Sequence, residues 1–238
     1  MRVQKYLSDI GFCSRRKAEK LMSEGRVEVN GKRVKLGDKV EKGDAVTVDG
    51  KRVDRKERRE KIYLAVYKPR GYVSTTSDPY AERCVTELVA EEKTRLYPIG
   101  RLDKLSEGLL LMTNDGDFSN LVSHPSSNIE KTYRVTVTPA MTQSDADRIF
   151  AGVELDDGMV YPLFFRVMGE RPDSTVFEIT LTEGRNRVVR RICESLGLSV
   201  KRLKRTAVGN IELKNLRPGQ YRELSAEEVG RIKKMAKK

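Results

Sequence analysis

The sequence predicts an α+β protein, and three observations lead to this prediction. Strand-like apolar runs and helical patterns are interspersed without a regular βαβ rhythm, which favours a mixed, largely antiparallel sheet over a doubly wound one. Residues 54–61 are all charged, and an apolar strand pattern follows them. The 238 residues are enough for one or two domains. We therefore predict a small helix-plus-strand domain at residues 1–60 and a larger domain at residues 61–238.

The composition excludes several classes of protein. No stretch approaches the ~20 consecutive apolar residues of a membrane helix, and the charged amino terminus lacks the apolar segment of a signal peptide. We therefore expect a cytoplasmic protein without a membrane partner. The three cysteines are odd in number and far apart, which argues against a disulfide framework or a clustered zinc site. The single histidine, His124, and the lack of a phosphate-binding glycine motif predict neither a metal nor a nucleotide cofactor.

The net charge of +12 is concentrated near the amino terminus. Residues 1–61 hold 19 Lys and Arg against 11 Asp and Glu, although they form only a quarter of the chain. Nucleic acid is the natural partner for such a segment, because each phosphate that a Lys or Arg neutralises releases condensed counterions. The alternative is that these side chains only keep the surface solvated.

The first 55 residues predict two short helices and a small sheet. The first helix is indicated by apolar residues at helical spacing, Val3, Tyr6, Leu7 and Ile10. A second helix is expected between an N-cap at Ser14 and a stop at Gly25. Beyond it, Asn30-Gly31 and Asp49-Gly50 are turn signals between short apolar runs, which is typical of hairpins.

Cations crowd the predicted start of the second helix, where the helix dipole disfavours them by roughly 0.3–1 kcal/mol each. Arg15, Arg16 and Lys17 lie in its first turn, and Lys20 follows one turn later. An RNA phosphate docked there would be held by these side chains and by the free backbone N–H groups. The alternative is an ordinary solvated cluster.

The segment VQKYLSDIGFCSRRKAEKLMSEGRVEVNGKRV resembles the small RNA-binding domain of the ribosomal-protein-S4 type. The match covers nearly the whole amino-terminal module. It implies binding to structured RNA through basic residues of the two helices, namely Lys5, Arg15, Arg16, Lys17 and Lys20. This resemblance implies nothing about catalysis.

The longer domain predicts a sheet with helices between its strands. Strand-like runs occur at residues 63–67, 108–112, 132–137 and 176–181. Helical patterns occur at about 84–92, 116–123, 142–150, 187–196 and 225–236. The last helix is expected to end in a solvated basic tail.

A carboxylate stands directly before the most apolar of these strands. Gly108–Met112 is uniformly apolar, which is typical of a strand buried on both faces, and Asp103 precedes it in the segment GRLD. A carboxylate at the mouth of a buried strand suits a catalytic position, with a nearby glycine allowing close approach. The alternative is that Asp103 caps a turn and pairs with Arg101.

Two further places hold chemically capable side chains. Four arginines, at positions 185, 187, 190 and 191, surround the start of a predicted helix against its dipole, which indicates an anion nearby. Tyr133 shares one strand face with Val135 and Val137, so it is either a site residue or a plain core residue.

Four segments resemble the ribosomal RNA pseudouridine synthases of the RsuA/RluB/RluF type. They are GRLDKLSEGLLLMTNDGD, NIEKTYRVTV, LTEGRNRVVRRICESLG and LRPGQYRELSAEE, in this order behind the amino-terminal module. PIGRLDK and EKTYRVTV are most similar to members that modify large-subunit RNA. The resemblance implies isomerisation of one uridine of ribosomal RNA to pseudouridine, with the target uridine flipped out of its helix.

The resemblance also implies roles for individual residues. Asp103 is the expected catalytic carboxylate, Tyr133 packs on the target base, and Arg190 is the basic residue of the EGRNRVVRR segment beside the carboxylate. Arg187 and Arg191 stay open as alternatives to Arg190. The residues expected to contact the substrate around the base are Arg101, Leu181 and Arg187.

The implied reaction explains these residue types. It breaks the bond between N1 of uracil and C1′ of ribose, rotates the base and rejoins it through C5, without redox change or group transfer. No cofactor is therefore expected. Asp103 either attacks C1′ or removes the C2′ proton, and a guanidinium beside it favours its ionised form. The ring of Tyr133 offers the base a stacking surface.

Other functions remain as alternatives. A pseudouridine synthase of this type could act on small-subunit ribosomal RNA or on transfer RNA. A non-catalytic RNA-binding factor in ribosome assembly would fit the basic patches equally well, but would not need Asp103 together with Tyr133 and the arginine cluster. Nothing in the sequence suggests an obligate protein partner, so a monomer is expected.

Overall fold

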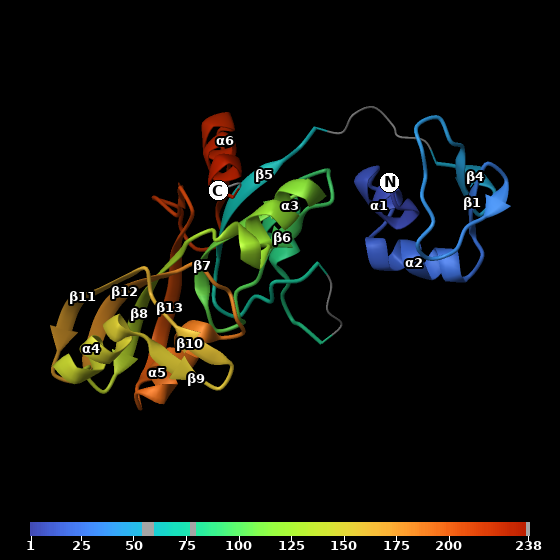
Figure 1. The fold of residues 1–238 in the computed structure, drawn as a ribbon. Helices are drawn as coiled ribbons and strands as arrows, with labels where there is room; N and C mark the ends of the chain where they lie inside the picture. The colour runs from blue at the N-terminus through green and yellow to red at the C-terminus, as the bar shows by residue number, and fades with distance from the viewer. Residues whose placement is uncertain (54–59, 77–79, 237–238) are drawn as a thin grey trace. The chain divides into compact units, whose positions relative to one another are not determined.

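The chain forms two units, and the hydrophobic core residues of each unit pack among themselves. The computed structural model describes residues 1–53, 60–76 and 80–236, and its contacts separate Met1–Lys61 from Ile62–Lys238 (Figure 1). The all-charged run begins at residue 54, so most of this expected linker lies outside the described residues. In the described ranges, no helix has the length and apolar character that a membrane crossing requires.

The amino-terminal unit packs helices α1 (Val3–Asp9) and α2 (Arg15–Ser23) with a small antiparallel sheet. The strand order is β2-β1-β3-β4, and the strands are β1 (Val27–Val29), β2 (Lys32–Arg33), β3 (Val46–Val48) and β4 (Lys51–Arg52). The predicted N-cap is confirmed, because Oγ of Ser14 accepts a hydrogen bond from the backbone N–H of Lys17 at 3.2 Å. Both predicted turns adopt positive φ angles, 52° at Asn30 and 51° at Asp49, as tight hairpins require.

A nine-stranded sheet organises the second unit. Its main path is β11-β12-β8-β13-β7-β5-β15, with β14 paired to β13 and β6 paired to β7. Every pairing is antiparallel in the described residues except the short one between β13 and β7, which confirms the predicted α+β class with a mixed sheet. The strands are β5 (Tyr63–Lys68), β6 (Tyr97–Ile99), β7 (Glu107–Thr113), β8 (Lys131–Thr138), β11 (Phe164–Arg171), β12 (Ser174–Leu181), β13 (Ser199–Val208), β14 (Ile211–Glu212) and β15 (Tyr221–Glu223).

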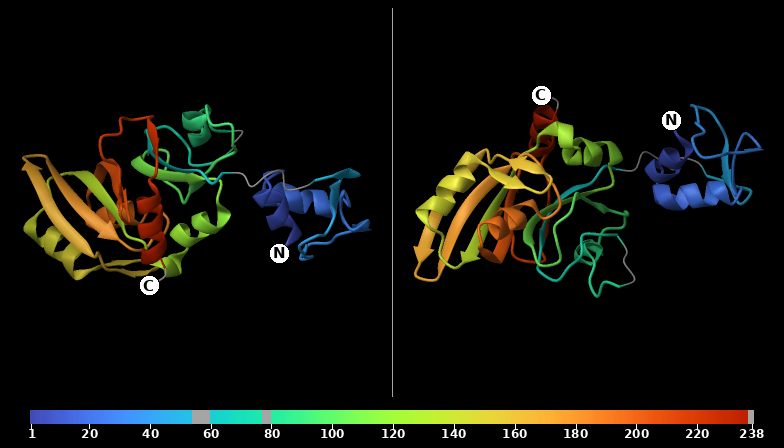
Figure 2. Two further views of the ribbon diagram at one scale, coloured as in Figure 1. Left: turned by 90° about the horizontal axis from the view of Figure 1, so that it is seen from above. Right: turned by 60° about the horizontal axis from the view of Figure 1, so that its bottom comes forward.

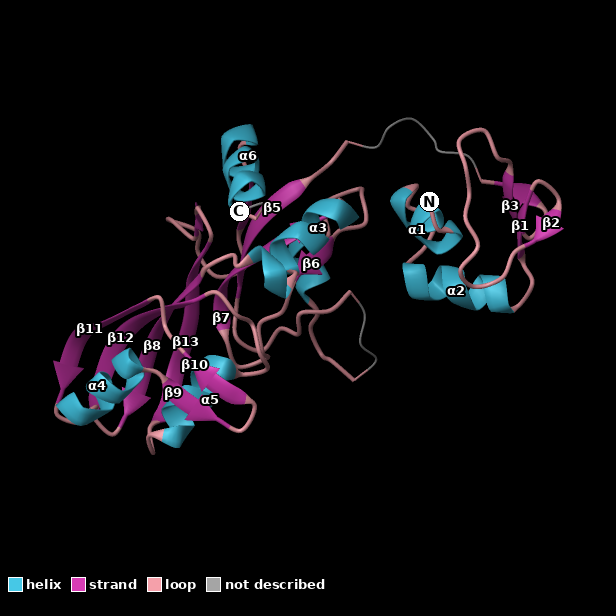
Figure 3. Ribbon diagram, in the orientation of Figure 1, coloured by secondary structure: helices cyan, strands magenta, loops and turns pink. Residues whose placement is uncertain are grey.

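Helices cover this sheet in two places. α4 (Gln143–Ala151), α5 (Val188–Ser195) and the hairpin of β9 (Val153–Leu155) and β10 (Gly158–Val160) lie over β8, β12 and β13, as Figure 3 shows. α3 (Gly116–Ser123) and α6 (Ala226–Met235) share a second core with β5 and β7. The views of Figure 2 show the same two groups around the sheet. Two short 3-10 helices, η1 (Val85–Val89) and η2 (Pro125–Ser127), complete the unit.

The structure differs from the sequence prediction in a few elements. The pattern at 84–92 forms only the short 3-10 helix η1 rather than an α-helix. The long strands β11 and β13 were not predicted, because their solvent-facing positions carry charged residues that interrupt any apolar run. The short strands β6, β9, β10, β14 and β15 were not predicted either. The predicted burial of Gly108–Met112 on both faces is confirmed, since every residue of β7 is buried. None of the three cysteines, all of which lie in the described residues, forms a disulfide bond.

Candidate active site

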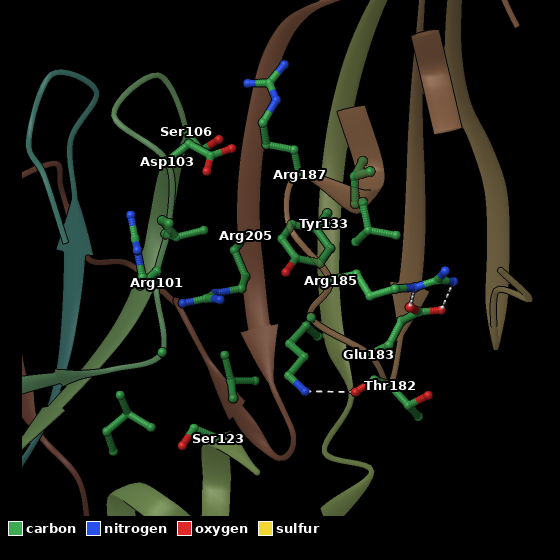
Figure 4. Close-up of a pocket in the computed structure, with 18 of the residues that line it drawn as sticks. Arg101, Asp103, Ser106, Ser123, Tyr133, Thr182, Glu183, Arg185, Arg187 and Arg205 are labelled. Carbon is green, nitrogen blue, oxygen red and sulfur yellow. Dashed lines mark hydrogen bonds and ion pairs between the residues drawn. The ribbon is translucent and has the colours of Figure 1, made fainter. Parts of the chain in front are cut away.

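A pocket of about 410 Å³ lies in the second unit beside the parallel contact between β7 and β13 (Figure 4). Pockets of this size commonly hold small ligands. Its wall combines the loop before β7, the first residues of β8, the segment after β12 and the end of β13. The polar side chains that matter here are those of Arg101, Asp103, Lys131, Tyr133, Arg187 and Arg205.

Asp103 is held in place by the loop that carries it. The backbone N–H of Ser106 donates to the Asp103 carbonyl at 3.0 Å, which closes a turn after the carboxylate. On the other side, the Ser74 hydroxyl bridges both backbone groups of the buried Leu102, at 2.8 and 3.0 Å. The carboxylate itself is 37% exposed and borders the pocket, so it is fixed in position but accessible to a ligand.

Arg190 is the arginine that faces this carboxylate. Its Nε lies 3.8 Å from Oδ2 of Asp103, and its Nη2 donates to the Ser106 hydroxyl at 3.3 Å. The side chain of Arg190 is 9% exposed, and burial lowers its pKa from the ordinary value. Its Nε makes no hydrogen bond to any described residue, so its contact with Asp103 is an ion pair without a hydrogen bond.

The two alternative arginines are engaged elsewhere. Arg187, which caps α5 with a φ of 50°, forms an ion pair with Glu194 at 3.0 Å. Arg191 pairs with the adjacent carboxylates of Asp156 and Asp157. The structure thus brings Arg190, and neither of its neighbours, into an ion pair with Asp103 among the described residues.

A buried lysine behind the carboxylate was not predicted from the sequence. Lys68 is fully buried, and its Nζ donates to the carbonyl oxygens of Ser106 at 2.7 Å and Pro69 at 3.0 Å. Burial lowers the pKa of Lys68 to about 8, although the nearby Asp103 carboxylate acts in the opposite direction. A lysine that ends the apolar run YLAVYK before a proline is the signal that could have identified it.

Tyr133 forms part of the pocket wall from β8, where it is 8% exposed. It pairs in register with Arg205 of β13 and Ile179 of β12, so the sheet fixes its backbone position. Leu181, in contrast, is fully buried in the core, and the neighbouring Thr182 lines the pocket in its place. Arg101 lies exposed at the wall, in the view of Figure 4 below Asp103.

The expected RNA contacts of the first unit lie on α1 and α2. Arg15, Arg16, Lys17 and Lys20 are exposed, and Lys20 forms a 3.8 Å ion pair with Glu24. Lys5 on α1 is half-buried. Four exposed cations within six residues form a surface that phosphate groups can approach.

The pocket's chemistry is that of ionisable side chains. In the residues that the structure describes, no three His, Cys, Asp or Glu side chains gather as metal ligands. A carboxylate beside a nearly buried guanidinium, in a pocket that a tyrosine also lines, can act as a base or as a nucleophile on a bound ligand.

Comparisons with known proteins identify the ligand class. The family described as RNA pseudouridylate synthase matches residues 62–195, and the S4 domain family matches residues 1–46. An uncharacterized RNA pseudouridine synthase of Mycobacterium tuberculosis is 43% identical, with 98% of this chain and 92% of that protein covered. The ribosomal large subunit pseudouridine synthase B of Bacillus subtilis is 40% identical over 99% of this chain and 96% of that protein.

More distant comparisons agree. The dual-specificity RNA pseudouridine synthase RluF of Escherichia coli is 39% identical over 96% of this chain and 77% of its own length. A crystal structure of a pseudouridylate synthase superposes with a TM-score of 0.67 at 25% identity, over 98% of this chain and 99% of that one. Fold, pocket and relatives together define an RNA-modifying enzyme. The chain belongs to the RNA pseudouridine synthase family, whose members convert uridine to pseudouridine.

Proposed function

We propose that this enzyme isomerises a specific uridine of large-subunit ribosomal RNA. The name of the Bacillus subtilis relative, which matches almost end to end, supports this substrate. The Escherichia coli relative is named for dual specificity, so small-subunit and transfer RNA belong in the same test. The proposal includes that the protein acts in the cytoplasm and as a monomer.

The observation that carries the proposal is the ion pair between Arg190 and Asp103 in a pocket that Tyr133 lines. We assign Asp103 as the catalytic carboxylate, which attacks C1′ or removes the C2′ proton. Arg190 positions Asp103 through this ion pair. Tyr133 contacts the uracil base, and a target in a paired helix must be flipped out to reach this pocket.

The remaining predicted residues have supporting roles. Arg101 and Arg187 border the pocket and can meet the phosphates on either side of the flipped nucleotide. Leu181 acts from the core, where it packs behind the pocket wall rather than against the base. In the S4-like domain at residues 1–60, we assign RNA binding to Lys5, Arg15, Arg16, Lys17 and Lys20.

The test is chemical mapping of pseudouridine in ribosomal and transfer RNA from cells that lack the gene. Complementation with the wild type should restore one uridine modification in large-subunit RNA, whereas Asp103→Asn should not. Asp103→Asn should keep RNA affinity close to that of the wild type, since it removes no phosphate contact. An unchanged map in the deletion strain would instead support a non-catalytic role in ribosome assembly.

A further inference from the structure

Two cations of the pocket, the half-buried Lys131 and the buried Arg205, have no part in the roles assigned above. Lys131 begins β8, and its Nζ donates to the carbonyl oxygen of Thr182 at 2.8 Å. Arg205, near the end of β13, is 6% exposed, and its Nε donates to the carbonyl oxygen of Leu109 at 2.7 Å. Both acceptors are neutral backbone groups, and neither cation has an ion pair with a carboxylate among the described residues.

This lack of a counter-charge separates them from the other basic residues nearby. Arg185 pairs with Glu183 and Asp157, and Arg187 pairs with Glu194. A cation withdrawn from water without an anionic partner is unfavourable, and here partial burial together with Arg205 lowers the pKa of Lys131 to about 8. Two such cations in one pocket indicate a ligand that supplies negative charge or carbonyl oxygens.

The proposed reaction creates such a ligand. When the N1–C1′ bond breaks, its electron pair stays on uracil, and the negative charge spreads over N1, O2 and O4. The C5–C1′ bond then forms, a proton leaves C5, and N1 gains a proton, so the overall change is an isomerisation. Uracil is anionic after bond cleavage whether Asp103 attacks C1′ or removes the C2′ proton. A cation beside the base would stabilise this intermediate.

We propose that Lys131, with Arg205 beside it, binds the carbonyl edge of uracil and stabilises the negative charge of the detached base. The inference rests on the proposed function and deepens it. Lys131 and Tyr133 are two residues apart on the same face of β8, so the ammonium group and the stacking surface face the same ligand.

The arrangement of the pocket supports this orientation of the nucleotide. In the view of Figure 4, Tyr133 and Arg205 lie between Asp103 and Thr182, whose carbonyl accepts the hydrogen bond from Lys131. A ribose whose C1′ or C2′ lies at Asp103 therefore extends its base over Tyr133 towards Lys131. Preorganised donors aimed at developing negative charge are among the strongest contributions to catalysis.

Three variants test the inference. Lys131→Met removes the charge, Lys131→Arg keeps it, and Arg134→Met is the control, because Arg134 is exposed on the opposite face of the same strand. In single-turnover assays with saturating RNA, Lys131→Met should slow pseudouridine formation by about 10²–10³-fold, as removal of one anion-stabilising donor does. Lys131→Arg should recover most of this rate, and Arg134→Met should match the wild type.

RNA affinity distinguishes a base contact from a phosphate contact. A contact with the detached base leaves the dissociation constant and its salt dependence unchanged in Lys131→Met. A phosphate contact would instead weaken binding and reduce the salt slope by about one unit, and this result would overturn the inference. Thermal unfolding of each variant shows whether a slow rate reflects misfolding. If Lys131→Met is misfolded, the rate and RNA affinity of Lys131→Arg test the inference instead.

The pH dependence provides a readout that a structural role would not change. The charged side chains that line the pocket with Lys131 are those of Arg205 on β13, the paired Glu183 and Arg185 after β12, Arg187 at the start of α5, and Arg101 and Asp103 before β7. At subsaturating RNA, the wild-type rate should fall above about pH 8 relative to that of Lys131→Arg, because arginine stays protonated. A constant ratio of the two rates, or a Lys131→Met enzyme as fast as Arg134→Met, would overturn the inference.

The proposed function and this inference can fail separately. A wild-type protein that forms no pseudouridine in any RNA contradicts the proposed function. An active wild type whose Lys131→Met variant is equally fast contradicts the role of Lys131 alone.

Discussion

Gly108 of β7 lies against the backbone of Arg205 in β13, so closely that a Cβ on Gly108 would lie 2.2 Å from the Arg205 carbonyl oxygen. Its φ of 106° is also one that L side chains rarely adopt. The two residues form part of the parallel pairing between these strands. Because the loop with Asp103 leads into β7 and Arg205 lines the pocket, this contact fixes both sides of the site.

Gly108→Ala should therefore destabilise the second unit by about 3 kcal/mol, through the clash with backbone atoms and the strained φ. Chemical denaturation would measure the change in the free energy of unfolding. Gly169→Ala in β11 is the matched control, since a Cβ there meets nothing within 4 Å and its φ is not positive. If Gly108→Ala and the wild type unfold at the same denaturant concentration, the close contact between β7 and β13 does not contribute to stability.

Arg190 should matter far more for turnover than its neighbour Arg191. Arg190→Met removes the guanidinium beside Asp103 and should lower the single-turnover rate by about 100-fold or more, with RNA affinity nearly unchanged because the side chain is almost buried. Arg191→Met is the control, since Arg191 pairs with Asp156 and Asp157 at the surface. Equal losses of rate in both variants would contradict the assignment of Arg190.

The sequence predicted the parts of the fold that depend on local signals. The cap at Ser14, the turn at Asn30 and the buried strand around Gly108–Met112 each follow from a pattern a few residues long. Strand β13 was missed because Lys201, Arg202 and Lys204 dominate its composition, and only its register with β8 and β7 makes it a strand.

The candidate active site also combines residues that the sequence predicted with residues that only the fold identifies. The GRLD segment, the tyrosine and the arginine cluster were visible in the sequence, and the spatial choice of Arg190 required the fold. The sequence could signal a buried lysine at Lys68, but neither its position behind Asp103 nor the place of Arg205 in the pocket wall could be predicted, because both depend on pairings between strands far apart in the chain.

The exposed cations of α2 should provide much of the electrostatic attraction to RNA. Replacing Arg15, Arg16 and Lys20 with Ala should weaken RNA binding and reduce its salt slope by up to about one unit for each phosphate that is no longer neutralised. Filter binding or fluorescence anisotropy across a salt series would measure both quantities.

A control for this experiment removes the same charge from other exposed positions of the first unit. The triple replacement of Lys35, Lys42 and Lys51 with Ala serves this purpose, because all three side chains are exposed outside α2. If both triple variants show the same decrease in affinity and slope, the protein's overall charge rather than α2 attracts the RNA.

Lys68 should make stability depend on pH in the alkaline range. Its pKa is lowered from 10.5 to about 8 by burial, so between these values the unfolded chain binds more protons than the folded one. The free energy of unfolding should therefore rise with pH from about 8 to 10.5, and Lys68 should contribute up to about 3 kcal/mol to this rise. Urea denaturation at pH 7.5 and pH 10 would measure it.

Lys68→Met isolates this contribution. The variant leaves the carbonyl oxygens of Ser106 and Pro69 without their donor, which lowers stability by the same amount at both pH values. The difference between the two pH values should consequently be smaller in Lys68→Met than in the wild type, because the titrating group is gone. Lys131, whose pKa is also lowered to about 8, remains in the variant and should retain its own share of the rise. A variant that gains as much stability as the wild type between pH 7.5 and pH 10 would contradict the lowered pKa of Lys68.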